Sequence, residues 1–226
     1  MTRTQFVYAL VILAVAALLG ALYLVYFGGS DASLSDSAPT YTISLQPRDM
    51  TLGSPHAPVQ VVEYAAPSCP ICAHWDMSVF PAFKKEYVDT GKVYYIFRVF
   101  PLRPLDAAVE AMARCLPKDS YFEFIDMMYR NQDKWDPDGN VIPDVHAALI
   151  QMGAVAGMNE TKVNSCISDQ PALDEITKVG QYATINYRID STPSFIIDGT
   201  FHQQDFMTPE AMRLLLNAEL KRKSGS

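Results

Sequence analysis

The sequence is short of the residues that build metal centres and disulfide scaffolds. It has four cysteines and four histidines in 226 residues. Four cysteines are too few for a disulfide-dense fold, and only Cys69 and Cys72 have the C-x-x-C spacing. No second such pair and no pair of histidines is available to complete a zinc tetrahedron. We therefore expect no metal site and no bound cofactor.

Positive charge is also scarce. The formal net charge is −7, the isoelectric point is near 5.0, and no basic stripe or internal repeat is present. This balance argues against nucleic acid as a partner. The 49 % hydrophobic content is ample for a packed core, and the length suits one ordinary domain with a short appendage.

The longest apolar stretch is the uncharged run from Phe6 to Phe27, which follows Arg3. A helix of about 20 apolar residues crosses a bilayer, so the run predicts one N-terminal transmembrane helix. With the positive end inside, the rest of the chain lies outside the cytoplasm. A cleaved signal peptide is the alternative, because Ser30–Ala32 is a small-x-small sequence, although signal cores are typically about 7 to 15 residues. Either way the compartment is oxidising and disulfides persist there.

This pattern divides the chain into three parts. Residues 1–27 are the membrane anchor or signal sequence. Residues 28–47 are rich in Gly, Ser and Asp without a helical or strand period, which predicts a flexible tether. Residues 48–223 then form the folded domain.

The domain opens with a predicted parallel β-α-β unit. Residues Val59 to Ala65 are mostly β-branched or aromatic, a 3.6-residue period follows, and Lys92 to Val99 is a second strand by composition. Pro81 is expected to kink the helix rather than end it. One helix face carries the apolar residues Cys72, Trp75, Val79, Phe83 and Tyr87.

A helical block separates this unit from the end of the domain. Helical periodicity runs from Leu105 to about Ile189, and we interpret residues 104–170 as an insertion. A hairpin is expected to follow, with its turn at Asp198-Gly199. Thr208 is the predicted N-cap of a closing helix.

The cysteine pair sits where the first strand gives way to the helix. A thiolate at Cys69 would be stabilised there by backbone N–H groups and the helix dipole. Because the thiolate is the reactive form of cysteine, this placement predicts thiol–disulfide exchange. Cys72 lies one turn into the helix and is expected to resolve the mixed disulfide.

Four segments together resemble the DsbA-like branch of the thioredoxin superfamily: Leu52–Val59, Val62–Tyr64, Cys69–Cys72 and Thr192–Phe195. The resemblance implies an α/β thioredoxin fold with an inserted helical subdomain. It also implies a cis peptide bond at Thr192–Pro193, where residue 192 hydrogen-bonds a bound substrate strand. The strongest oxidases of the family pair proline with histidine between the cysteines, whereas Ile71 stands here and supplies no cation.

Three further residues have predicted roles: Glu63, Cys115 and Cys166. Glu63 lies in the first strand, where burial would raise its pKa and let it relay a proton to Cys72, as the matching acid does in the family. The alternative is an edge residue wetted by solvent. Cys115 and Cys166 are predicted to form a structural disulfide in the helical block, the alternative being two buried free thiols.

These features predict an enzyme, a thiol oxidase that donates the Cys69–Cys72 disulfide to reduced or unfolded exported proteins. Its expected place is the periplasmic side of the inner membrane, anchored through residues 6–27, as a monomer reoxidised by a quinone-linked membrane partner. A disulfide isomerase or reductase using the same cysteines is one alternative. A metal-carrying or holdase module is another.

Overall fold

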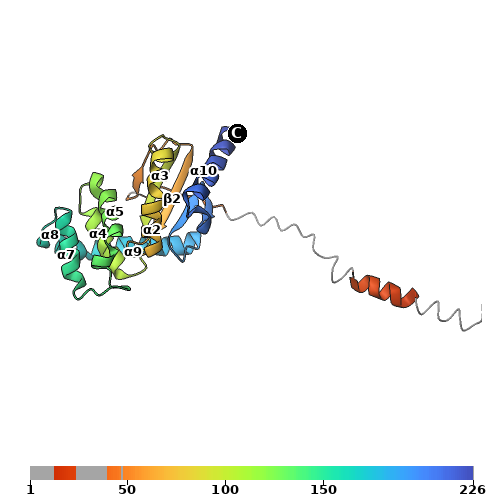
Figure 1. The fold of residues 1–226 in the computed structure, drawn as a ribbon, viewed down its shortest axis with the longest axis horizontal. Helices are drawn as coiled ribbons and strands as arrows, with labels where there is room; N and C mark the ends of the chain where they lie inside the picture. The colour runs from red at the N-terminus through yellow and green to blue at the C-terminus, as the bar shows by residue number, and fades with distance from the viewer. Residues whose placement is uncertain (1–12, 24–39, 47, 226) are drawn as a thin grey trace, which may run out of the picture. The chain divides into compact units, whose positions relative to one another are not determined.

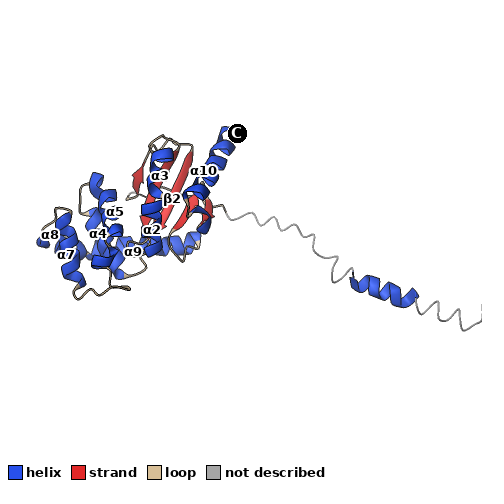
Figure 2. Cartoon of the chain, viewed as in Figure 1, coloured by secondary structure: helices blue, strands red, loops and turns tan. Residues whose placement is uncertain are grey.

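A computed structural model describes residues 13–23, 40–46 and 48–225, in two compact units divided at Ser37 and Ala38. The larger unit is built on a five-stranded sheet in the order β1-β3-β2-β4-β5 (Figure 2). Strands β2 and β3 are parallel, and the other neighbours are antiparallel. The strands are β1 Met50–Leu52, β2 Val59–Ala65, β3 Val93–Val99, β4 Ser194–Ile197 and β5 Thr200–His202.

The expected parallel β-α-β unit is confirmed, but its helix differs from the prediction. Instead of one kinked helix, the chain forms α2 Pro70–Ser78, α3 Phe80–Phe83 and a π-helical turn, η1 Lys84–Val88. Pro81 has no N–H to donate to the preceding turn, which explains the interruption at Val79. The apolar face is nevertheless continuous, because all five residues predicted for it are buried.

The helical insertion is also confirmed, and Figure 1 shows α4, α5, α7 and α8 grouped beside the sheet. Helix α9 then returns the chain to the strands. The segments are α4 Pro104–Arg114, η2 Lys118–Ser120, α5 Tyr121–Arg130, α6 Gln132–Trp135, α7 Val145–Val155, α8 Glu160–Ile167 and α9 Gln170–Tyr187.

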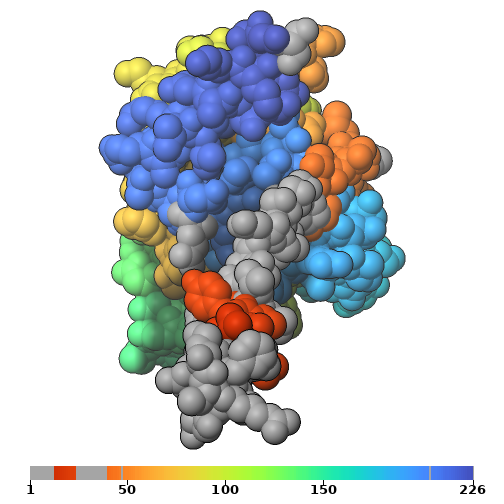
Figure 3. All heavy atoms as spheres, turned by 90° about the vertical axis from the view of Figure 1, so that its right-hand side faces the viewer, coloured from red at the N-terminus to blue at the C-terminus, as the bar shows by residue number. Residues whose placement is uncertain are grey.

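Alternate residues of β2 feed cores on opposite faces of the sheet. Val59 and Val61 belong to the core shared with α2 and α10 Pro209–Ser224, whereas Val62 and Tyr64 belong to the core shared with α9. Both faces of the central strand are therefore covered, as is typical of parallel strand pairs joined by a helix. Figure 3 shows α10 in dark blue on the surface, next to the yellow α3–η1 segment. Arg213 of α10 pairs there with Glu86 of η1 at 2.7 Å.

The segment after α9 adopts the turn and the helix cap that its sequence predicts. Both residues of the β4–β5 turn have positive φ, 46° at Asp198 and 89° at Gly199, as a two-residue hairpin requires. A short turn, η3 Gln204–Phe206, follows β5. The Thr208 hydroxyl then caps α10 by accepting from the N–H of Ala211 at 3.1 Å. The predicted hairpin and cap are confirmed.

The predicted tether, residues 28–47, needs correction where the structure describes it. The N–H of Tyr41 donates to the carbonyl of Gly199 at 2.6 Å, and its ring packs edge-on against Tyr187 at 5.4 Å between centroids. Residues 40–46 therefore belong to the folded unit, held by an aromatic and an antiparallel contact that sequence periodicity does not reveal. Residues 28–39 and 47 lie outside the described residues.

The predicted membrane helix over residues 6–27 is described only at residues 13–23, which are helical and expose apolar side chains such as Leu18 and Leu19. Within the described parts of the chain, no helix combines the length and apolarity needed to cross a bilayer. Residues 6–12 and 24–27 lie outside them.

Candidate functional site

Cys69 is the N-cap residue of α2, at the carboxyl end of β2. Its extended backbone (φ −78°, ψ 117°) turns the sulfur back over the first helical turn, where it accepts from the N–H of Cys72 at 3.2 Å. Pro70 occupies the first helical position, where a backbone N–H would have no partner within the helix, so the N–H that proline lacks is not missed. The local sequence thus aims backbone dipoles at one sulfur.

Both thiols are free, and their pKa values are shifted in opposite directions. The pKa of Cys69 is lowered to about 6, chiefly by a hydrogen bond from the Cys72 side chain, and burial opposes this. Thr192 and the N–H groups of Cys72 and Ile71 lower it further. Burial is the first cause that raises the pKa of Cys72 well above its ordinary value, and the charge on Cys69 adds to it. At neutral pH the pair therefore holds one thiolate, at Cys69.

The turn before β4 brings Thr192 and Pro193 to this sulfur. The peptide bond between them is cis, and the Thr192 carbonyl oxygen lies 3.4 Å from the Cys69 sulfur, which donates to it only when protonated. Ser191 braces the turn, because its carbonyl accepts from the Ser194 hydroxyl and its hydroxyl accepts from the Gln203 amide, both at 2.7 Å.

Glu63 is buried beneath the cysteines on the central strand β2. Only 2 % of its surface is exposed, and the Tyr95 hydroxyl donates to its carboxyl group at 2.6 Å. Burial raises the pKa of Glu63 to about 8, and the charge on Cys69 acts in the same direction. The alternative of a solvent-wetted edge residue is wrong, because β2 is flanked by β3 and β4.

Sequence reasoning missed two polar groups near Glu63. The apolar helix face predicted from the sequence did not include Asp76, yet its pKa is raised to about 7, mainly by burial and then by the charge on Asp126. One oxygen of Asp76 and the hydroxyl of Tyr129 are buried without a hydrogen-bond partner in the described structure. The four-residue spacing from Cys72 to Asp76 is the signal that placed both on one helix face.

Asp106 is a further residue that the sequence did not single out. It is fully buried at the start of α4 and accepts from the N–H of Ser68 at 2.8 Å. Its second oxygen accepts from the N–H groups of Leu102 and Arg103, both at 3.0 Å. This carboxylate therefore ties the turn before Cys69 to the first inserted helix.

Cys115 and Cys166 are joined in the structure by a disulfide with an S–S distance of 2.04 Å. Cys115 directly follows α4 and Cys166 lies in α8, so the bond closes the insertion on itself. In the described residues, no group of three or more His, Cys, Asp or Glu side chains is arranged to hold a metal ion.

An apolar cavity of about 310 Å³ lies between α9 and the segment that follows β3. It is lined by residues that follow β3, including Phe100 and Pro101, and by α9 residues such as Gly180 and Ile185. The N–H of Phe100 donates to the carbonyl of Ala65 at 2.8 Å, at the end of the strand that leads to Cys69. The Ile71 side chain between the cysteines is also exposed.

Comparison with known proteins gives a consistent picture. The family described as Thioredoxin matches residues 45–218. A putative protein-disulfide oxidoreductase of Rickettsia bellii is 30 % identical over 159 residues, 70 % of this chain and 60 % of that protein. A probable disulfide bond formation protein D of Bacillus cereus is 29 % identical over 177 residues, 76 % of this chain and 79 % of that protein. This chain spans no more than 60 % of the first curated relatives it matches.

Solved structures agree with this. The crystal structure of Wolbachia pipientis alpha-DsbA1 is 26 % identical, with a TM-score of 0.70, and the match covers 80 % of this chain and 96 % of that one. BdbD from Bacillus subtilis, 19 % identical with a TM-score of 0.67, covers 81 % of this chain and 98 % of its own and shows the shared fold.

Proposed function

Because this chain belongs to the thioredoxin family and, within it, to the DsbA-like branch, we propose that it is a protein-disulfide oxidoreductase that oxidises exported proteins. The observation that carries the proposal is that the pKa values of the two cysteines are shifted in opposite directions. That of Cys69 is lowered to about 6 and that of Cys72 is raised. A pair arranged in this way gives up its disulfide readily, since the released Cys69 thiolate is stabilised.

The reaction proceeds in two exchanges. A substrate thiolate attacks the sulfur of Cys69 in the disulfide, and Cys72 leaves as a thiolate that takes a proton from the buried Glu63. A second substrate thiolate then attacks the substrate sulfur of the mixed disulfide, and Cys69 leaves as a thiolate. The substrate loses two electrons and gains a disulfide, and the enzyme is left with two reduced cysteines.

The pKa of Cys69 sets the direction of this exchange. A fall from 9.0 to about 6 stabilises the reduced pair. At pH 7 a thiol with the ordinary pKa of 9.0 is protonated, so only the part of the shift between about 6 and pH 7 stabilises the reduced pair. At 1.36 kcal/mol per pKa unit and 30 mV per 1.4 kcal/mol, this makes the disulfide roughly 30 mV more oxidising than one with an unshifted Cys69.

Reduced or unfolded polypeptides are the proposed substrates. The Thr192–Pro193 turn beside Cys69 offers main-chain hydrogen bonds to an extended strand. The exposed Ile71 side chain and the apolar cavity between Phe100 and α9 suit apolar side chains that a folded protein would bury.

The proposed setting is the periplasmic face of the inner membrane. The apolar run over residues 6–27 supports a single-pass anchor, and residues 28–39 link it to a monomeric catalytic domain. Tethering raises the effective concentration of the site near translocating substrates and near a quinone-linked membrane reoxidase.

Isomerase or reductase activity is the second candidate, and Ile71 is the observation that favours it. A histidine there would add a cation beside the Cys69 thiolate, whereas isoleucine adds none. The test is the equilibrium of the Cys69–Cys72 pair with glutathione, together with oxidation of a reduced two-cysteine peptide. An oxidase is expected to have a potential well above the thioredoxin value of about −270 mV and to oxidise the peptide stoichiometrically. A potential near that value, with faster rescue of scrambled disulfides, would favour the isomerase.

A further inference from the structure

Two polar side chains of the helical insertion bind the turn Pro67–Cys69, which we call the redox turn. Asp106 of α4 binds the N–H of Ser68, as described above. Gln132, the first residue of α6, donates from Nε2 to the carbonyl oxygen of Pro67 at 2.7 Å and to that of Cys69 at 3.1 Å. The backbone on both sides of Ser68 is therefore held by residues far away in the sequence.

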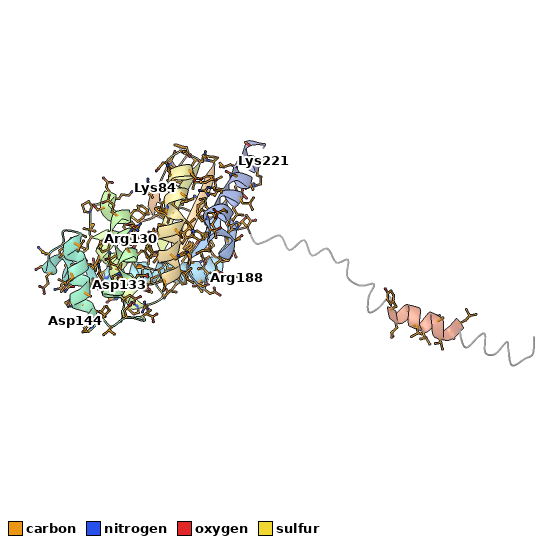
Figure 4. All side chains as sticks on the ribbon, viewed as in Figure 1. Lys84, Arg130, Asp133, Asp144, Arg188 and Lys221 are labelled. Carbon is orange, nitrogen blue, oxygen red and sulfur yellow. A yellow bond between two sulfur atoms is a disulfide. The ribbon has the colours of Figure 1, made fainter. Side chains whose placement is uncertain are left out.

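Helix α6 is short, but it is fixed at its far end. Its last residue, Trp135, is fully buried and donates from Nε1 to the carbonyl of Met128 at 2.9 Å. The next residue, Asp136, accepts two hydrogen bonds from Arg103, both at 2.8 Å. In Figure 4, the neighbouring Asp133 is labelled near the start of α2. The Gln132 amide is thus presented by an anchored element.

We propose that Gln132 is a positioning residue, through which the helical insertion holds the Pro67–Cys69 turn at the start of α2. The Cys69 carbonyl accepts from the N–H of Ala73 at 3.0 Å within α2, and the Gln132 amide adds a second hydrogen bond that holds the peptide unit after Cys69 from the insertion. It thereby fixes the direction of the Cys69 side chain relative to the N–H of Cys72, 3.2 Å from the sulfur. The bond to the Pro67 carbonyl fixes the turn on the other side.

The consequence concerns the stability of the Cys69 thiolate. When the turn is held, the sulfur stays where the backbone N–H groups of α2 can bind it. Without the two donors of Gln132, the turn gains freedom and the thiolate spends less time against these groups. Its role in oxidation rests on the proposed function, since a less stable thiolate is a poorer leaving group.

The test is Gln132→Met, which keeps the length of the side chain and removes both donors. The control is Gln170→Met on α9, where the amide bonds only the exposed Asp174 at 2.7 Å. The full-length protein, with Cys69 and Cys72 reduced and the Cys115–Cys166 disulfide intact, is alkylated with iodoacetamide across a pH series. The rate reports the Cys69 thiolate, because Cys72 is fully enclosed and its pKa is raised well above the ordinary value. We expect Q132M to lower the rate at pH 6 about threefold, a rise in midpoint of roughly 0.7 pH units by the titration relation, and Q170M to leave it unchanged.

An unchanged pH profile in Q132M would overturn the inference, even if its thermal stability fell. Should Q132M not fold, Gln132→Asn serves instead, because it keeps the amide but is one methylene too short to reach both carbonyls. We expect an upward shift in Q132N as well, and its absence has the same meaning. Alkylation does not require oxidase activity. If the wild type fails to oxidise a peptide while the Q132M shift is present, the proposed function fails and the positioning role stands.

Discussion

Cys69 and Cys72 carry the same chemical group three residues apart, and their surroundings separate them. One sulfur lies where the first helical N–H groups converge, and the other lies one turn deeper, fully buried in the core. The N-cap position of Cys69 follows from local sequence, so the direction of its pKa shift was predictable. The burial of Asp76 was not, because it depends on α5, which lies about fifty residues further along the chain.

Glu63 gives the clearest prediction at this scale, which concerns how the free energy of unfolding depends on pH. Its folded pKa is raised from 4.5 to about 8, so the folded protein holds the proton after the unfolded chain has lost it. The free energy of unfolding therefore falls between pH 4.5 and 8, by up to about 1.4 kcal/mol per pH unit, and levels off above that range. Glu63→Gln removes this loss, so the variant should gain stability relative to the wild type from pH 5 to 8.

The measurement is urea unfolding of the oxidised protein, in which Cys69 does not titrate. Glu123→Gln, at an exposed site on α5, is the matched control and should run parallel to the wild type. Asp76 has a raised pKa of about 7 and contributes a slope of the same sign in every variant. Parallel curves for E63Q and the wild type would show that Glu63 is ionised in the folded state.

At the scale of elements, sequence prediction succeeded where the signals are local. The β-α-β unit, the Asp198-Gly199 turn and the Thr208 cap each depend on residues within a few positions of one another. Strand β1 was missed because it has only three residues and gains its identity from pairing with β3. Arg98 of β3 adds a buried ion pair with Asp49 at 2.7 Å, another contact between distant segments.

The disulfide of the insertion carries the prediction for this scale. Cys115 and Cys166 close a loop of 51 residues between α4 and α8. Because the crosslink restricts the unfolded chain, replacing both cysteines with alanine should lower the free energy of unfolding by about 4 kcal/mol. Urea unfolding of C115A/C166A against the wild type measures this. The Cys69 alkylation profile should stay unchanged, and a loss below about 1 kcal/mol would contradict a stabilising role.

At the scale of the whole molecule, the inserted helices shape the redox turn as well as flank it. Asp106 and Gln132 both bind backbone atoms next to Cys69, yet neither has a sequence signal beyond a polar residue in a helical segment. Contacts of this kind arise only when the fold brings distant segments together. For the same reason the folded unit begins before the predicted boundary at residue 48, because Tyr41 is held by contacts with the distant residues Gly199 and Tyr187.

The last prediction concerns the apolar run over residues 6–27. If it anchors the protein, the full-length chain should remain in the membrane fraction after an alkaline wash. Leu18→Arg with Leu19→Arg places two charges in the middle of the run, at about 2.5 to 3.5 kcal/mol each, and should release the protein. Leu214→Arg, at an exposed site on α10, should have no effect. Intact mass separates the alternatives: loss of the first thirty or so residues would indicate a signal peptide, whereas release of the uncut wild-type chain would contradict the anchor.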